Sequence, residues 1–435
     1  MRMRFGETIF SVASGVGRSA LSVLRVSGPA CEAVLCGLLR SLPPPRRASL
    51  RSLRGADGTV LDRALVLWFP APASYTGEDC CELHLHGGLA VLEGVTAALV
   101  ALGARQAEPG EFTRRAVSYG RMDLLEAEAV ADLIDAETAL QRDQALLQMG
   151  GALSTIYTGW AARLVRLLAQ QEALIDFPDE DLPPEIDAEL RAEIGRLRAA
   201  FLAHLSEGSR GEKLRSGLVF AIAGAPNAGK STLINALCQR EIAIVSPRPG
   251  TTRDVLEARI EIAGVPVTLL DTAGLRETED PEEAEGVRRA RARVQQADLV
   301  IALWPPDAEA GPDLAAMSGP VLSVRSKVDL AEVLVDGAIA ISARSGQGMD
   351  ALLAALEAEV RRLAGSSGTA VLTRARHRLA LEDAALHLAL ALENDLAELR
   401  GEELRLAVQA LGRITGAVGV EEVLDSVFGQ FCIGK

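Results

Sequence analysis

The sequence predicts a multidomain α+β protein with an N-terminal α+β domain, a discontinuous all-α helical domain and an α/β domain inserted into the helical one. Short β-like runs mix with Gly- and Pro-containing turns near the start, whereas two later stretches keep an apolar helical period. Between those stretches, apolar strands alternate with helical segments. At 435 residues, the chain is too long for one ordinary core. We expect domain boundaries that give the segments 1–120, 121–212, 213–365 and 366–435.

The first two domains differ in their periodicity. Residues 1–120 contain β-like runs such as Ala64–Phe69, separated by turn residues. From Leu124 to about residue 209, apolar side chains recur on one helical face, with interruptions near Pro178 and Pro183. The same period returns after Thr373. The helical domain is therefore expected to form from segments on both sides of an insertion.

The inserted domain is predicted from its alternation of apolar strands and helical segments, which is typical of a doubly wound sheet. Insertion is easy when the two ends of a domain lie close together, as they often do. The expected strands are 218–223, 265–270, 299–303, 321–324 and 338–341.

Composition excludes several classes of protein. Six cysteines without C-x-x-C spacing indicate neither a disulfide framework nor a zinc ribbon. The net charge of −14 argues against a protein that coats nucleic acid, so any RNA contact is expected to be local or to belong to a partner. No run of about 18 apolar residues lacks a charge, which predicts a cytoplasmic protein without a membrane span. Only four of the 45 Lys and Arg residues are lysines, so each lysine is expected to have a specific role.

A phosphate-binding loop is predicted at Gly224–Ser231. The residues Gly-Ala-Pro-Asn-Ala-Gly-Lys-Ser fit G-x-x-x-x-G-K-[ST], follow an expected strand and open an expected helix. Its glycines let backbone N–H groups surround the α- and β-phosphates at the helix N-terminus. Lys230 is expected to reach the β- and γ-phosphates, and Ser231 to place its hydroxyl on Mg²⁺.

Four further segments follow at the separations that such a fold requires. Gly250–Thr252 can supply a hydroxyl to Mg²⁺ from a loop that senses the γ-phosphate, and Asp271–Gly274 can face the metal through water. In Ser326–Asp329, the carboxylate of Asp329 can accept the N1 and amino hydrogens of guanine. Adenine would leave that carboxylate unpaired, so GTP is predicted rather than ATP. Backbone N–H groups of Ser342–Arg344 are expected to meet the guanine O6.

Two positions depart from common GTPase patterns. Ser326 replaces the asparagine of Asn-Lys-x-Asp, which points to a looser tie between the base loop and the P-loop. Leu275 stands where a Ras-like enzyme carries the glutamine that orients the attacking water. Help for hydrolysis is therefore expected from an acid in the following loop, although a solvated surface position is the alternative for each of them. These acids are Glu277, Glu279, Glu282 and Glu283.

Several independent stretches carry a family resemblance. They are Val23–Gly28, Ser74–Asp79, Glu82–Gly88, Pro109–Arg115, Ala127–Asp135, Ile175–Pro178 and Phe431–Lys435. Through these stretches, which are spread over essentially its whole length, the chain resembles the bacterial MnmE (TrmE) family of tRNA modification GTPases. Such a set of matches is far more specific than a P-loop.

The resemblance implies an N-terminal domain that dimerises and binds a tetrahydrofolate in the 5-formyl or methylene form, and a GTPase domain stimulated by potassium. It also implies a homodimer that forms a heterotetramer with the flavoprotein MnmG and acts on tRNA. Family members add an aminomethyl or carboxymethylaminomethyl group to carbon 5 of the wobble uridine. Folate is the implied one-carbon donor, and FAD and NADH belong to the partner.

The resemblance also implies cation ligands and catalytic residues. Ser231 and Thr252 would hold Mg²⁺, Glu283 is similar to the family's catalytic glutamate, and Lys230 is the second catalytic candidate. A monovalent cation beside the phosphates can supply the charge that other GTPases take from an arginine finger. The implied potassium ligands are Asn227, Ser246 and Arg248 through backbone carbonyls in the loop, and Thr251. The candidate GTP-binding residues are Asn227, Ala228, Gly229, Lys230, Ser231, Thr232, Ser246, Pro247, Arg248, Pro249, Gly250, Thr251, Thr252, Asp271, Thr272, Ala273, Gly274, Ser326, Lys327, Asp329, Ser342, Ala343 and Arg344.

A folate site is implied at four positions, with ordinary surface ion pairs as the alternative. These positions are Arg25, Glu82, Arg121 and Lys435. A cation there can meet a folate carboxylate, and Glu82 can accept pterin N–H hydrogens. Cys432 is either a reactive thiol near the folate or a small buried residue, and both readings stay open. Glu82, His84 and His86 also alternate onto one strand face and could bind a metal, although the folate assignment already uses Glu82.

Two other classes of GTPase are the alternatives. A ribosome-assembly GTPase would act as a switch on structured RNA, but no RNA-binding module is recognisable and the acidic charge disfavours it. A membrane-remodelling GTPase would need an amphipathic basic helix or an anchor. The basic run Arg374–Arg378 is too short for that role and is typical of a solvated helix start.

Overall fold

The protein is described here by a computed structural model, and it divides into two compact units. The first unit comprises Met1–Ala131, Met149–Ala169 and Leu404–Lys435, and the second comprises Asp132–Gln148 and Gln170–Glu403. Both units are built from segments far apart in the chain, and the multidomain α+β fold is confirmed. The structure describes residues 6–15, 17–176, 184–240, 257–271, 294–306, 319–330, 337–365, 371–416, 427–428, 431 and 434.

The N-terminal part of the first unit contains a six-stranded sheet in the order β3-β4-β5-β2-β1-β6. Neighbouring strands are antiparallel except for β1 and β6, which are parallel. The expected run at Ala64–Phe69 is confirmed as the second half of β4. The strands are β1 (Ile9–Val12), β2 (Ser19–Ser27), β3 (Ser49–Arg54), β4 (Val60–Phe69), β5 (Cys80–Gly87) and β6 (Arg105–Gln106).

The two faces of this sheet have different roles because successive strand residues point to opposite sides. Leu24 and Val26 of β2 and Leu83 of β5 are buried in the core, where α1 (Cys31–Leu39) and α2 (Leu89–Ala101) pack. The alternate residues of the same strands therefore lie on the other face. That face carries the polar side chains of the pocket described below.

A short helix contacts the loop that precedes β5 and fixes its position. Arg115 of α3 (Glu111–Ser118) is buried and pairs with Glu78 at 2.9 Å and with Glu111 at 2.9 Å. Burying this arginine is compatible with stability because both carboxylates compensate its charge. Tyr75 in the same loop shares a 2.8 Å hydrogen bond with Thr113 of α3. Contacts with α3 therefore fix the position of this loop, which lines the pocket described below.

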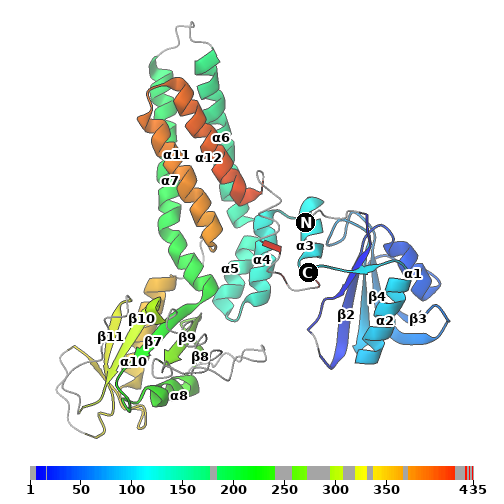
Figure 1. Ribbon diagram of the computed structural model, residues 1–435, viewed down its shortest axis with the longest axis horizontal. Coiled ribbons are helices and arrows are strands. Elements are labelled where there is room, and N and C mark those ends of the chain that lie inside the picture. The colour runs from blue at the N-terminus through cyan, green and yellow to red at the C-terminus, as the bar shows by residue number, and fades with distance from the viewer. Residues whose placement is uncertain are drawn as a thin grey trace, which may run out of the picture. The chain divides into compact units, whose positions relative to one another are not determined.

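Long helices form the predicted helical segments. Leu190, Ile194, Leu197 and Phe201 are buried along one face of α7, at the spacing expected for a helix that packs on a neighbour. That neighbour is α11, which runs beside α7 (Figure 1). The helices are α4 (Leu124–Asp135), α5 (Ala139–Met149), α6 (Ala152–Asp176), α7 (Pro184–Ser216), α11 (Ala375–Glu393) and α12 (Ala397–Thr415).

The second unit contains a six-stranded sheet in the order β12-β11-β10-β7-β9-β8. Five expected strands are confirmed, with the last one shortened, and β8 is an antiparallel edge strand that the apolar alternation did not predict. Helices α8 (Lys230–Arg240) and α10 (Met349–Ala364) belong to the same domain. The strands are β7 (Leu218–Ala223), β8 (Glu257–Ile262), β9 (Val265–Asp271), β10 (Leu299–Trp304), β11 (Val321–Arg325) and β12 (Ile339–Ala340).

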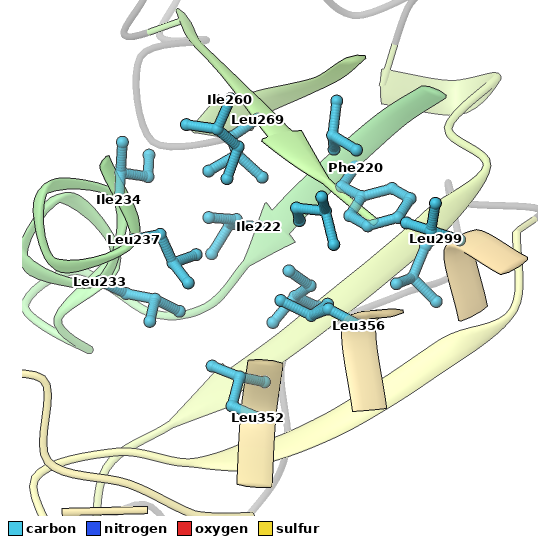
Figure 2. Packing of buried hydrophobic residues seen from close by; sticks show 14 of the residues in the cluster. Phe220, Ile222, Leu233, Ile234, Leu237, Ile260, Leu269, Leu299, Leu352 and Leu356 are labelled. Carbon is cyan, nitrogen blue, oxygen red and sulfur yellow. The ribbon is translucent and has the colours of Figure 1, made fainter. Parts of the chain in front are cut away.

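The core of this domain joins both helices to the sheet. Phe220 and Ile222 of β7 pack with Leu233 and Leu237 of α8 and with Leu356 of α10 (Figure 2). Burying such apolar side chains is the main favourable term for the domain. The same cluster includes Leu214, because α7 continues to Ser216 and enters the core, so the proposed boundary at 212/213 falls inside a helix. Within the described ranges, no helix is long and apolar enough to cross a membrane.

Candidate functional site

The phosphate-binding loop lies between β7 and α8, as the motif predicts. Gly224 has to be glycine because a Cβ there would lie 2.5 Å from the carbonyl oxygen of Leu303. Asn227 and Gly229 have φ values of 63° and 97°, a region that favours asparagine and glycine. The loop therefore turns sharply into the start of α8, the end of a helix at which backbone N–H groups can bind phosphate.

Two polar side chains at the end of this loop have defined hydrogen-bond partners. The buried Lys230 donates from Nζ to the carbonyl oxygens of Gly224 at 2.8 Å and Ala225 at 3.0 Å. The hydroxyl of Ser231 lies 3.2 Å from Oδ2 of the buried Asp271 at the end of β9. A hydroxyl and a carboxylate are hard oxygen ligands, so this pair fits Mg²⁺.

A pocket of about 170 Å³ brings three predicted segments together beside α8. It unites the end of the P-loop with Ser326–Asp329 and with Ser342–Arg344. The parallel pairing of β11 with β12 explains this, because their carboxyl ends meet at one edge of the sheet. The lining residues are Gly229, Thr232, Leu233, Leu303, Ser326, Lys327, Asp329, Leu330, Ile341, Ser342, Ala343 and Arg344.

Ser326 makes a direct contact between the base loop and the P-loop, and the looser tie expected for a serine in place of asparagine stays a prediction. The Ser326 hydroxyl is buried and donates a 2.7 Å hydrogen bond to the carbonyl oxygen of Ala228 in the P-loop. The backbone N–H of Ser326 also donates to the carbonyl oxygen of Trp304 at 3.0 Å, which fixes the base loop against β10.

We expect Ser326→Ala to destabilise the GTPase domain by about 1–3 kcal/mol, because the carbonyl oxygen of Ala228 would lose a buried donor. GTP affinity should fall as well, since the loop on each side of the base would be less restrained. Denaturant unfolding and equilibrium GTP titration measure the two effects. Ser323→Ala, on β11 three residues earlier, is the matched control, and an equal loss in both variants would contradict the role of the Ser326 hydroxyl.

Several predicted residues lie outside the described residues, so their assignments stay predictions. They comprise the potassium loop, the rest of the segment that begins at Asp271, the catalytic acid and the C-terminal positions. These residues are Ser246, Pro247, Arg248, Pro249, Gly250, Thr251, Thr252, Thr272, Ala273, Gly274, Glu283, Cys432 and Lys435.

A second pocket, of about 480 Å³, opens on the N-terminal sheet and contains three of the four predicted folate positions. Its volume lies in the range of small-molecule sites, about 300–1,000 Å³. Several of its residues, including Arg46 and Tyr75, are not among the predicted site residues. The lining residues are Arg25, Arg46, Phe69, Ala73, Ser74, Tyr75, Cys80, Glu82 and Arg121.

Strand register brings Arg25 and Glu82 together. They face each other on β2 and β5, and the Arg25 guanidinium donates to Glu82 Oε1 from Nε at 3.1 Å and from a terminal nitrogen at 2.8 Å. The Arg25 Cζ atom also lies 4.8 Å from the ring centroid of Tyr75. Burial raises the pKa of the Tyr75 phenol, although Thr113 and Arg25 oppose the shift, so the ring stays neutral beneath the cation.

The alternative metal site does not assemble. His84 Nε2 lies 3.5 Å from Glu82 Oε2, but His86 is exposed and pairs with Asp62 at 2.8 Å. In the part of the chain that the structure describes, no three His, Cys, Asp or Glu side chains are grouped so as to hold a metal ion. The strand places these residues on one face, as predicted, but the hydrogen bond to Asp62 turns the last imidazole to a different partner.

Two family models together match most of the chain. Residues 8–121 match the family model described as GTP-binding protein TrmE N-terminus, and residues 124–432 match the MnmE helical domain. The tRNA modification GTPase MnmE of Gluconacetobacter diazotrophicus is 60% identical over 432 residues, which is 98% of each chain. The protein of the same name from Granulibacter bethesdensis is 54% identical over 437 residues, which is 99% of each chain.

Among solved structures, the FeoB G-domain from Methanococcus jannaschii is 24% identical and covers 33% of this chain and 98% of its own, with a TM-score of 0.25. The family assignment rests instead on the full-length relatives and on the two family models. With a P-loop, a base pocket and full-length identity of this level, the chain belongs to the MnmE (TrmE) family of tRNA modification GTPases.

Proposed function

We propose that this protein is a potassium-stimulated GTPase whose turnover drives modification of tRNA. With the flavoprotein MnmG, it would add an aminomethyl or carboxymethylaminomethyl group to carbon 5 of the wobble uridine. The relatives' printed name supports the tRNA modification, and the family supports the partner and the position. We further propose that the working unit is a homodimer that forms a heterotetramer with MnmG in the cytoplasm, with domain segments 1–120, 121–212, 213–365 and 366–435.

The observation that carries the GTPase proposal is the pocket shared by the P-loop and the two base-reading segments. Asp329 lines this pocket together with Ser342, Ala343 and Arg344. The backbone N–H of Ser342 already donates to the carbonyl oxygen of Gln347 at 2.9 Å, so the Asp329 carboxylate and the N–H groups of Ala343 and Arg344 would meet the base. Guanine matches that arrangement and adenine does not. The nearby Gly229 and Thr232 connect the base pocket to the loop that would bind the phosphates.

The roles of the chain's own residues follow from their chemistry. Lys230 would leave the carbonyl oxygens of Gly224 and Ala225 to neutralise the β- and γ-phosphates, since it is already buried beside the loop. Ser231 and Asp271 would hold Mg²⁺, which supplies positive charge to the phosphate oxygens when bound. We propose that Glu283 orients the attacking water and that Thr252 is the second hydroxyl ligand of Mg²⁺.

Potassium is proposed to bind beside the P-loop. Asn227 offers an amide oxygen from a left-handed backbone position, and Ser246, Arg248 and Thr251 would complete the site from their loop. A second cation close to the phosphates would act where other GTPases use an arginine finger. This proposal explains how the chain can hydrolyse GTP with Leu275 in place of the usual glutamine.

The pocket on the N-terminal sheet is proposed to bind a tetrahydrofolate. The group fits the residues present, because Glu82 can accept ring N–H hydrogens while Arg121 can bind a carboxylate. Lys435 is proposed as a further ligand-binding residue. When bound, the folate supplies the one-carbon unit, and the protein's residues hold its ring and its acidic tail.

We expect GTP hydrolysis by the purified protein to be several-fold faster in potassium than in sodium at equal ionic strength, because the proposed site discriminates between the two ions. Asn227→Ala should remove the difference between the salts by deleting a ligand. Glu283→Ala should slow hydrolysis in both salts by about 100-fold, since a positioned acid or base contributes about that much. Initial rates of phosphate release at saturating GTP measure these effects.

Asp350→Asn is the control for general effects on the domain, because Asp350 is an exposed residue at the start of α10. Equal rates of the unmodified protein in the two salts would disprove the cation-based mechanism. A ribosome-assembly GTPase would then be the function to test, through sedimentation with ribosomal particles.

A further inference from the structure

The pocket on the N-terminal sheet is lined by a cation that no motif indicates. Arg46 lies between α1 and β3, and its backbone φ is 57°, a left-handed value that is uncommon for arginine. Its backbone N–H donates a 2.8 Å hydrogen bond to the carbonyl oxygen of Trp68. This bond compensates the unusual backbone and places Arg46 beside the end of β4. Such conformations are often retained where a side chain has a function.

The guanidinium of Arg46 is oriented by two other lining residues. Its Cζ atom lies 5.9 Å from the ring centroid of Phe69, and a terminal nitrogen donates to the carbonyl oxygen of Ala73. Neither contact neutralises the charge. Among the described residues, no carboxylate pairs with Arg46, so its remaining N–H groups are available to an anion.

The charges of the pocket are unbalanced at the Arg46 end. Its lining contains three arginines and one described carboxylate, and that carboxylate, Glu82, is already paired with Arg25 at 2.8 Å. In the strand register, Phe69 lies opposite Cys80, two residues before Glu82. Arg46 therefore contacts the sheet next to the residues that precede Glu82 on β5, and not Glu82 itself.

We propose that Arg46 is a ligand-binding residue that selects the acidic tail of the ligand in this pocket. The inference rests on the proposed binding of a tetrahydrofolate and names a determinant of its specificity. A folate carries carboxylates at the end opposite its pterin ring, and a guanidinium can bind a carboxylate through two parallel hydrogen bonds. Glu82 thus accepts hydrogens from the ring, while Arg46 acts with Arg121 at the tail.

The test compares a tailed ligand with one that lacks the tail. Binding of 5-formyltetrahydrofolate and of 6-methyltetrahydropterin to the full-length protein is measured by calorimetry for the unmodified chain, Arg46→Gln and Arg47→Gln. Arg47→Gln is the matched control because the neighbouring arginine is exposed and does not line the pocket. Arg46→Gln should weaken the formyl folate by about tenfold or more and the pterin by less than about twofold. Arg47→Gln should leave both affinities unchanged.

A second measurement separates contact from pocket shape. If Arg46 meets an anion, the salt dependence of formyl folate binding should be less steep in Arg46→Gln, and Arg46→Lys should restore part of the affinity. Equal weakening of both ligands, or of neither, would overturn the assignment of Arg46 while leaving folate binding intact. Failure of the unmodified protein to bind the formyl folate would instead refute the proposed folate site, and the role of Arg46 with it.

Discussion

Lys230→Ala is expected to lower kcat/KM for GTP hydrolysis at least about 100-fold, because one preorganised cation at transferring phosphates typically has this effect. The ammonium group is buried and is held by the carbonyl oxygens of Gly224 and Ala225 at the mouth of the loop. No other lysine belongs to the P-loop. Steady-state phosphate release measures the loss, and titration with a non-hydrolysable GTP analogue separates binding from catalysis.

A matched lysine is available as the control. Lys213 is half-buried near the end of α7 and pairs with Asp298 at 3.0 Å, away from the phosphate loop. Lys213→Ala should keep kcat/KM within a few-fold of the unmodified protein, and thermal unfolding should show that both variants are folded. Turnover by Lys230→Ala close to the unmodified rate would mean that this lysine does not stabilise the transferred charge.

Asp329→Asn is expected to weaken GTP binding by at least about 100-fold and to improve binding of xanthosine triphosphate. A carboxylate accepts both the N1 and the amino hydrogens of guanine, whereas an amide can accept only one hydrogen and presents N–H groups. Xanthine carries an oxygen where guanine has the amino group, so it matches the amide better. A mismatch of this kind leaves polar groups unpaired, which discriminates strongly between bases.

Competition titrations with a fluorescent guanine nucleotide measure this change of specificity. Asp350→Asn makes the same chemical change at an exposed position of the same domain, and it should leave the preference for GTP unaltered. An equal affinity of Asp329→Asn and the unmodified chain for GTP would show that another group reads the base.

Local patterns predicted much of the GTPase domain correctly. The strand at 218–223 and the P-loop that follows it lie where they were expected, because apolar runs and glycine requirements are readable within a few residues. The antiparallel strand β8 was missed. Its alternating sequence at an edge of the sheet is less apolar than the central strands, so the pattern of buried strands did not include it.

The N-terminal pocket shows the limit of such patterns. Family resemblance placed Arg25, Glu82 and Arg121 in a common site, and the structure gathers them in one pocket. Arg46 and Tyr75 were not predicted as pocket residues, although Tyr75 lies in one of the stretches that carry the resemblance. Their positions depend on a backbone hydrogen bond to β4 and on a contact with α3, and neither leaves a local signal in the chain.

The sequence by itself determined the order of the domains, the phosphate loop and the choice of GTP, because these depend on short-range spacing and on the chemistry of single side chains. The tertiary structure decided three other features: Ser326 reaches the carbonyl oxygen of Ala228, His86 turns to Asp62, and Arg46 faces the pocket. Each depends on the distance between segments that only the packing of the whole domain brings together. A hydroxyl, an imidazole or a guanidinium acquires its partner from that packing, so its role cannot be predicted from the residues next to it in the sequence.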